Sequence, residues 1–157
     1  MKCELWWIGK TNASYLKEGI NVYTKRLGKY TSFDIKEIAD QKNAKHLSTS
    51  ELKNKEGSSI LKRLEAKDYV ILLDENGKSY SSVGFAKYIE KLQNASYQKI
   101  IFIIGGAYGF SDALYSRAQA KLGLSPMTFS HQMVRMIFTE QLYRAFSINN
   151  NEPYHHQ

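Results

Sequence analysis

Short apolar runs alternate along this chain with longer segments in which apolar residues recur every three or four positions. The first pattern predicts strands and the second predicts amphipathic helices. We expect strands at residues 5–8, 33–38, 69–73 and 100–104, with a brief fifth at 122–124, and helices at 15–30, 48–64, 81–92, from Ser111, and at 131–148. This order predicts an α/β fold, a mainly parallel sheet flanked by helices.

Local signals set the expected ends of these elements. Ser48-Thr49-Ser50-Glu51 has the S-x-x-E pattern of a capping box and predicts a helix start. Asn76-Gly77 is a strong turn signal, expected to close the third strand. Residues 39–47 are polar and predict a loop. The run at 100–104 is apolar throughout, as in a central parallel strand buried on both faces. No repeat or linker divides the chain, so one domain over residues 1–157 is expected.

Charge and composition narrow the possible partners. The 157 residues carry a formal net charge of +7, which favours a polyanion such as nucleic acid, although basicity can also serve solubility alone. Cys3 is the one cysteine, so no zinc site or intrachain disulfide is expected. No apolar run approaches the length of a membrane span, and we expect a cytoplasmic protein without metal or membrane association.

Two turn-rich loops in the last third are the candidate site. Parallel sheets bind ligands at the carboxyl ends of their strands, where Leu73, Gly105-Gly106-Ala107-Tyr108-Gly109 and residues 125–130 are expected. Glycines let a backbone approach a nucleotide-like group closely, but they also end many buried strands for packing reasons. The loop follows the fourth strand rather than the first, which disfavours a dinucleotide fingerprint, and no P-loop motif occurs.

The final helix is apolar on most sides, which predicts a central helix or one shared with a second subunit. His131 stands at its start and is a candidate base, with capping or packing as the alternative. Arg135 interrupts the apolar stripe and is interpreted as functional rather than merely exposed. Glu140 and Arg144 have the spacing of an ordinary surface ion pair. His155 and His156 have the alternative of a solvated tail.

Four segments together resemble the bacterial ribosomal large subunit methyltransferase H family: IGGAYG at 104–109, LSPMTFSHQMVR at 124–135, EQLYRAF at 140–146 and PYH at 153–155. The resemblance extends along nearly the whole chain. It implies a SPOUT-class homodimer with a C-terminal trefoil knot. The implied reaction transfers a methyl group from S-adenosyl-L-methionine to N3 of a pseudouridine in 23S ribosomal RNA, on assembled ribosomes at the subunit interface.

The resemblance also implies roles for individual residues. Cofactor contacts fall on the three strand-end loops, at Leu73, Gly106, Ser125, Pro126, Met127, Thr128, Phe129 and Ser130. We expect His131, or His155 of a second subunit, to assist loss of the acceptor proton. Arg135 is expected to bind phosphate or stabilise the developing charge. RNA contacts are expected at Arg135, Arg144, Tyr154 and His155.

Two positions depart from the family pattern, and two other functions compete with it. Ser130 stands where the family usually has proline, and His156-Gln157 stands where it usually has Lys or Arg. Loss of proline affects loop stiffness, since proline fixes φ. A nucleotide-dependent oxidoreductase is disfavoured by the missing ribose-binding carboxylate. A non-catalytic RNA-binding protein is disfavoured by the resemblance of the cofactor loops.

Overall fold

The computed structural model describes residues 1–156 and contains a five-stranded sheet in which every strand pair is parallel. The strands are β1 (Lys2–Ile8), β2 (Ser32–Ile38), β3 (Tyr69–Ser79), β4 (Lys99–Ile104) and β5 (Ala120–Gly123), in the spatial order β2-β1-β4-β3-β5. The helices are α1 (Ser14–Leu27), α2 (Thr49–Leu61), α3 (Ser82–Asn94), α4 (Asp112–Arg117) and α5 (His131–Asn149). The predicted α/β class and its parallel sheet are therefore confirmed.

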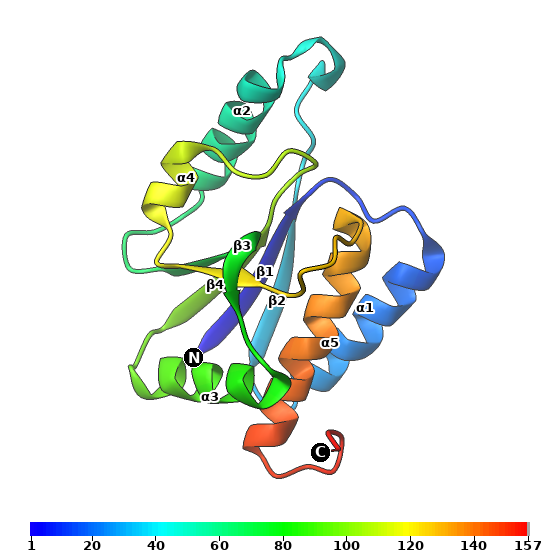
Figure 1. Ribbon diagram of the computed structural model, residues 1–157, viewed down its shortest axis with the longest axis vertical. Coiled ribbons are helices and arrows are strands. Elements are labelled where there is room, and N and C mark those ends of the chain that lie inside the picture. Colours follow the sequence, from blue (N-terminus) through cyan, green and yellow to red (C-terminus); the bar gives the residue numbers. More distant parts are fainter. Residues whose placement is uncertain (157) are drawn as a thin grey trace.

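The helices form two layers, one on each face of the sheet (Figure 1). Successive strand residues point to opposite faces, so Phe102 joins the core under α1, α3 and α5 while Ile103 joins the core under α2 and α4. Residues 100–103 of β4 are completely buried, as expected of a strand covered on both faces. Helix α5 packs against both α1 and α3, which makes it the central helix of its layer.

Serine caps explain where several helices begin. The hydroxyl of Ser48 accepts a hydrogen bond from the Glu51 amide at 3.1 Å, which confirms the predicted start of α2. Ser81 and Ser111 cap α3 and α4 in the same way. Helix α2 ends at Leu61 rather than Leu64, and α1 ends at Leu27 rather than Tyr30. The expected loop at 39–47 contains one 3₁₀ turn, Ala44–His46.

The predicted end of the third strand was wrong. Strand β3 does not stop at Leu73 but continues to Ser79, and both Leu73 and Lys78 pair with Leu122 of β5. Residues 74–77 therefore form a bulge inside the strand. A β-carbon at Gly77 would lie 2.6 Å from the Leu122 backbone, so the glycine permits this close return rather than a chain-reversing turn. The bulge displaces Asp74, Glu75 and Asn76 from the ladder.

The trefoil knot implied by the resemblance stays a prediction.

Within residues 1–156, no helix is both long and apolar enough to cross a membrane.

Candidate functional site

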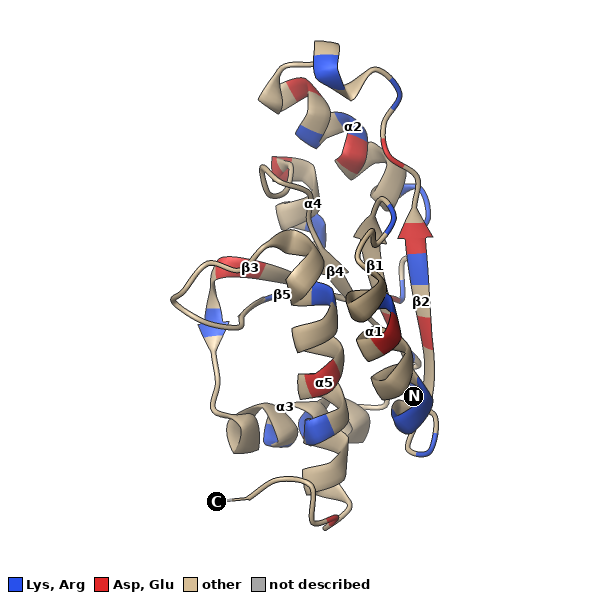
Figure 2. Cartoon of the chain, turned by 90° about the vertical axis from the view of Figure 1, so that its right-hand side faces the viewer, with Lys and Arg blue, Asp and Glu red and all other residues tan. Residues whose placement is uncertain are grey.

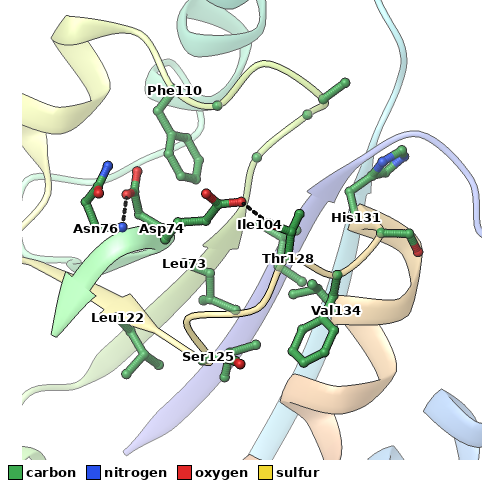
Figure 3. Close-up of a pocket in the computed structure, with 18 of the residues that line it drawn as sticks. Leu73, Asp74, Asn76, Ile104, Phe110, Leu122, Ser125, Thr128, His131 and Val134 are labelled. Atoms are coloured by element: carbon green, nitrogen blue, oxygen red, sulfur yellow. Dashed lines mark hydrogen bonds between the residues drawn. The ribbon is translucent and has the colours of Figure 1, made fainter. Parts of the chain in front are cut away.

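A cavity of about 570 Å³ opens beside the bulge in β3 and at the carboxyl ends of β4 and β5 (Figure 3). It is lined by three segments that are remote in sequence: residues 73–76, residues 104–110, and the stretch from Leu122 to Val134. The expected cofactor residues that line it are Leu73, Gly106, Ser125, Met127, Thr128, Phe129 and Ser130. Pro126 is the one expected cofactor residue that does not contribute to the lining. The structure thus brings together the three loops that the sequence singled out.

The bulge in β3 forms one wall of this cavity. Asp74 holds it in shape, because its Oδ1 accepts a hydrogen bond from the Asn76 amide at 2.8 Å and its Oδ2 accepts one from the Tyr115 hydroxyl. Burial, followed by this bond to Asp74, raises the pKa of Tyr115 to about 12. Glu75 is exposed, and its Oε1 accepts from the Thr128 hydroxyl at 3.4 Å across the mouth of the cavity.

The glycine loop forms the second wall, and two of its glycines pack closely against neighbouring side chains. A β-carbon at Gly105 would lie 3.1 Å from the Phe110 ring, and one at Gly106 would lie 2.9 Å from Oε1 of Glu56. Gly109 has φ +85°, which favours glycine. Burial, then the charge of Asp40, raises the pKa of Glu56 behind this loop. The packing interpretation of these glycines is therefore supported, and close approach to a nucleotide-like ligand stays a prediction.

The third wall is the loop that leads into α5. Ser125 Oγ accepts from the Met127 amide at 3.0 Å, and Ser130 Oγ accepts from the Met133 amide at 3.1 Å. Ser130 is therefore the N-cap of α5, and this cap is what the chain has in place of the family's proline. Met127 is 75% exposed and Phe129 37% exposed, so apolar surface stands uncovered at the cavity mouth. His131 is exposed and lines the cavity, as expected.

Arg135 does not reach the cavity or the surface. It is 2% exposed, its Nη1 donates to Thr11 Oγ1 at 2.9 Å, and its Nη2 donates to the Ile8 carbonyl at 2.8 Å. The guanidinium also lies 4.9 Å from the centre of the Trp7 ring. Burial lowers the pKa of Arg135, and the charges of Glu37 and Asp40 oppose that shift. Arg135 was expected at a phosphate; in this structure it ties α5 to the end of β1 instead.

A second polar cluster joins the far end of α5 to the tail. Arg144 Nη2 donates to Glu140, and Arg144 Nη1 lies 3.1 Å from Nδ1 of His155. The Tyr154 hydroxyl donates to Glu140 at 2.9 Å and lies 3.4 Å from the Tyr23 hydroxyl, from which it can accept. Its ring lies 4.7 Å from the Arg144 guanidinium. Burial, then the bonds to Tyr23 and Glu140, raises the pKa of Tyr154. We call Tyr23, Glu140, Arg144, Tyr154 and His155 the tail cluster.

The loop that leads into α5 and the C-terminal tail lie at opposite ends of this helix (Figure 1). An α-helix rises about 1.5 Å per residue, so the Arg144 Cα lies roughly 20 Å along the axis from that of His131. One subunit therefore does not bring His155 to the cavity. Sequence reasoning missed Glu56 and Tyr23, whose contacts come from distant segments, and gave Glu75 no role beyond its place at a strand end. His156 is exposed, and Gln157 lies outside the described residues.

Helix α5 retains apolar surface that the rest of the subunit does not cover. Met133 and Ile137, one turn apart, are half-buried and belong to neither core cluster. Few charged positions interrupt the exposed side of the helix in Figure 2. Among residues 1–156, no group of three or more His, Cys, Asp or Glu side chains is arranged to hold a metal ion.

Comparison with known proteins places the chain among methyltransferases. Residues 1–155 match the family described as predicted SPOUT methyltransferase. The chain is 55% identical to ribosomal RNA large subunit methyltransferase H of Flavobacterium johnsoniae and 52% identical to that of Parabacteroides distasonis, in both cases over all of both proteins. The SpoU methyltransferase AviRb of Streptomyces viridochromogenes, solved with AdoMet, gives a TM-score of 0.45 at 9% identity, covering 96% of this chain and 61% of that one.

Proposed function

Because the chain belongs to the SPOUT methyltransferase family, we propose that it methylates large-subunit ribosomal RNA with S-adenosyl-L-methionine as the methyl donor. The proposed target is N3 of a pseudouridine in 23S ribosomal RNA, and the proposed substrate is the assembled ribosome. The observation that carries this proposal is the cavity formed by the three strand-end loops of the resemblance.

The cavity suits S-adenosylmethionine in size and in chemistry. Its volume of about 570 Å³ lies within the range of small-molecule sites. Leu73, Ile104 and Leu122 offer an apolar wall for the adenine, and the glycine loop offers backbone that a ligand can approach closely. Carboxylates at the mouth offer partners for a positively charged ligand. The residues present therefore fit this cofactor.

The cofactor supplies an electrophilic methyl group when bound, and the protein has to position the acceptor and accept its proton. His131 lines the cavity and is the base that we assign within the same subunit. We assign Arg135 the role of a positioning residue. Its hydrogen bonds to Thr11 and Ile8 hold the first turns of α5 in place, and His131 is the first residue of that helix. Holding the reactants together in this geometry is the main source of rate enhancement in such a transfer.

We propose that the active site is completed in a homodimer. His155 is the alternative base, and with Arg144 and Tyr154 it is proposed to contact RNA. Since these residues lie roughly 20 Å along α5 from His131, they reach a cavity only if it belongs to a second copy. The uncovered strip of Met133 and Ile137 offers apolar surface for that copy.

Basic residues of α1 extend the proposed RNA surface from the tail cluster. The Arg26 guanidinium lies 5.5 Å from the Tyr23 ring centre and 5.6 Å from that of Tyr143, which places it beside the tail cluster. Lys25 and Lys29 flank it in sequence. Contacts of this kind weaken steeply as salt rises, because phosphate binding releases counterions. Ribosome binding should therefore fall between 50 and 200 mM salt by at least about tenfold.

The test uses ribosomes from cells that lack this protein. Purified protein and labelled S-adenosylmethionine are incubated with assembled ribosomes, with free large subunits and with naked ribosomal RNA, and the modified nucleotide is located by mass spectrometry. We expect one N3-methylpseudouridine, formed best on assembled ribosomes. Equal activity on naked RNA would refute the assembled substrate, and methylation of an unmodified uridine would refute the pseudouridine requirement.

A further inference from the structure

The cavity is acidic although the protein is basic. The chain has a formal net charge of +7, yet the residues lining the cavity include Asp74 and Glu75 and, within the part of the chain described, neither a lysine nor an arginine. Both carboxylates come from the bulge in β3, which the close approach of Gly77 to Leu122 makes possible. The sign of the charge at this site is therefore opposite to that of the molecule as a whole.

The two carboxylates are not equivalent. Both oxygens of Asp74 accept hydrogen bonds within the protein, from the Asn76 amide and the Tyr115 hydroxyl, so Asp74 maintains the bulge. Glu75 accepts only one long bond, from Thr128 Oγ1 at 3.4 Å to its Oε1, which is one of the dashed lines in Figure 3. Its Oε2 has no partner among residues 1–156. Glu75 is thus the carboxylate available to a ligand.

We propose that Glu75 is a specificity-determining residue that makes the cavity prefer S-adenosylmethionine over its product, S-adenosylhomocysteine. This inference rests on the proposed function. Methyl transfer converts the positively charged sulfonium of the donor into a neutral thioether, while the ammonium and carboxylate groups stay unchanged. A carboxylate at the cavity mouth attracts the donor more strongly than the product because only the donor carries the additional charge. The same preference favours product release after each transfer.

The size of the effect follows from the exposure of Glu75. A solvent-exposed charge pair is screened by water, so the selectivity should be modest. Replacing the carboxylate by an amide of the same shape should weaken S-adenosylmethionine binding by about two- to fivefold, and S-adenosylhomocysteine binding by less than about twofold.

The experiment measures the dissociation constants of both ligands by titration calorimetry with the full-length protein. Three variants are compared with wild type: Glu75→Gln, Thr128→Val, which removes the hydroxyl contact but keeps the charge, and Glu90→Gln. Glu90 is exposed on α3 and absent from the cavity lining, so its variant matches the change in net charge. We expect the preference for the donor, the ratio of the two dissociation constants, to shrink in Glu75→Gln and to persist in Glu90→Gln. Because Thr128 lines the cavity, Thr128→Val should weaken both ligands alike and leave that ratio unchanged. In wild type it should also shrink as ionic strength rises.

Several outcomes would overturn the proposal. Equal weakening of both ligands in Glu75→Gln would mean that the carboxylate acts on their common ammonium group or on the shape of the loop. The same loss of preference in Thr128→Val would assign the effect to the hydrogen bond rather than to charge. If Glu75→Gln fails to fold, the salt dependence of wild type still tests the proposal. A preference of wild type for S-adenosylmethionine that does not change with salt would overturn it. If neither ligand binds wild type at all, the proposed function itself fails, a result distinct from these.

Discussion

Arg144 links α5 to the tail through His155, whose Nδ1 lies 3.1 Å from Nη1 of the arginine. The other terminal nitrogen of the guanidinium, Nη2, donates to Glu140, one turn earlier on α5. Tyr154 donates to the same carboxylate at 2.9 Å. Tyr154 and His155 are therefore half-buried and held in a defined conformation, while Pro153 and His156 are exposed.

Mixing two disabled variants should restore methylation if the active site is shared between subunits. Gly106→Val should shift the glycine loop that lines the cavity, since its β-carbon would lie 2.9 Å from the Glu56 carboxylate behind the loop. Arg144→Ala should disrupt the tail cluster. Each alone should have little activity on ribosomes. Random exchange of subunits in an equal mixture makes about half of the dimers mixed. Each mixed dimer has one site with both defects and one intact site, so about a quarter of all sites, and of wild-type activity, should return.

The control for this experiment mixes Arg144→Ala with His155→Ala, two variants that disable the same element. That mixture should gain nothing. A shared site would be contradicted if Arg144→Ala were fully active by itself. It would also be contradicted if mixing Arg144→Ala with Gly106→Val gave no gain in activity under conditions where subunits exchange.

Replacing Arg135 should lower the stability of the fold rather than remove a direct contact with RNA. Arg135→Met keeps the volume but leaves the Ile8 carbonyl and the Thr11 hydroxyl without their buried donors. We expect the free energy of unfolding to fall by about 2–4 kcal/mol in urea titrations. Arg63→Ala, which removes an exposed arginine of the opposite layer, should cost less than about 0.5 kcal/mol. A stable Arg135→Met protein with unchanged cofactor binding but no ribosome binding would instead support a direct phosphate contact.

Ser130 should be replaceable by proline but not by alanine. Ser130→Ala loses the cap on the Met133 amide and should cost about 1 kcal/mol of stability. Ser130→Pro loses the same cap, but Ser130 has φ −60°, which proline adopts naturally, so reduced freedom of the unfolded chain offsets the loss. Thermal unfolding should place Ser130→Pro within about 0.5 kcal/mol of wild type. A large destabilisation by proline would show that this loop needs the Ser130 amide.

Cys3 should be unreactive while the protein is folded. The thiol is fully buried in β1, and burial raises its pKa to about 12, so almost no thiolate is present at pH 8. A thiol reagent at pH 8 should label native protein at least about a hundredfold more slowly than protein unfolded in urea. Labelling of the native protein at the unfolded rate would show that β1 opens readily.

The Gly77 backbone should control the shape of the cavity through the bulge. Gly77→Ala places a β-carbon 2.6 Å from the Leu122 backbone, so the bulge has to move and take Asp74 and Glu75 with it. We expect a loss of about 2–3 kcal/mol of stability and weaker S-adenosylmethionine binding, measured by urea titration and calorimetry. Gly28→Ala, at a residue with φ −58°, is the matched control and should change neither by much. Unaltered binding in Gly77→Ala would separate the bulge from the site.

The sequence by itself determined the α/β class, the parallel sheet and nearly all its elements, because apolar periodicity and serine caps act over a few residues. It also named the three loops of the cavity through a pattern of short motifs. Only the tertiary structure decided what Asn76-Gly77 does, because a turn signal and a bulge look alike until the partner strand β5 is in place.

Tertiary structure likewise decided the fate of Arg135 and of the tail. A cation on an apolar helix has no visible partner in sequence, yet its acceptors, Ile8 and Thr11, lie more than a hundred residues earlier in the chain. The tail residues were named from their motif, but their place at the opposite end of α5 from His131 depends on the helix being one continuous rod. Local sequence patterns thus named candidate residues, and long-range packing decided which of them meet.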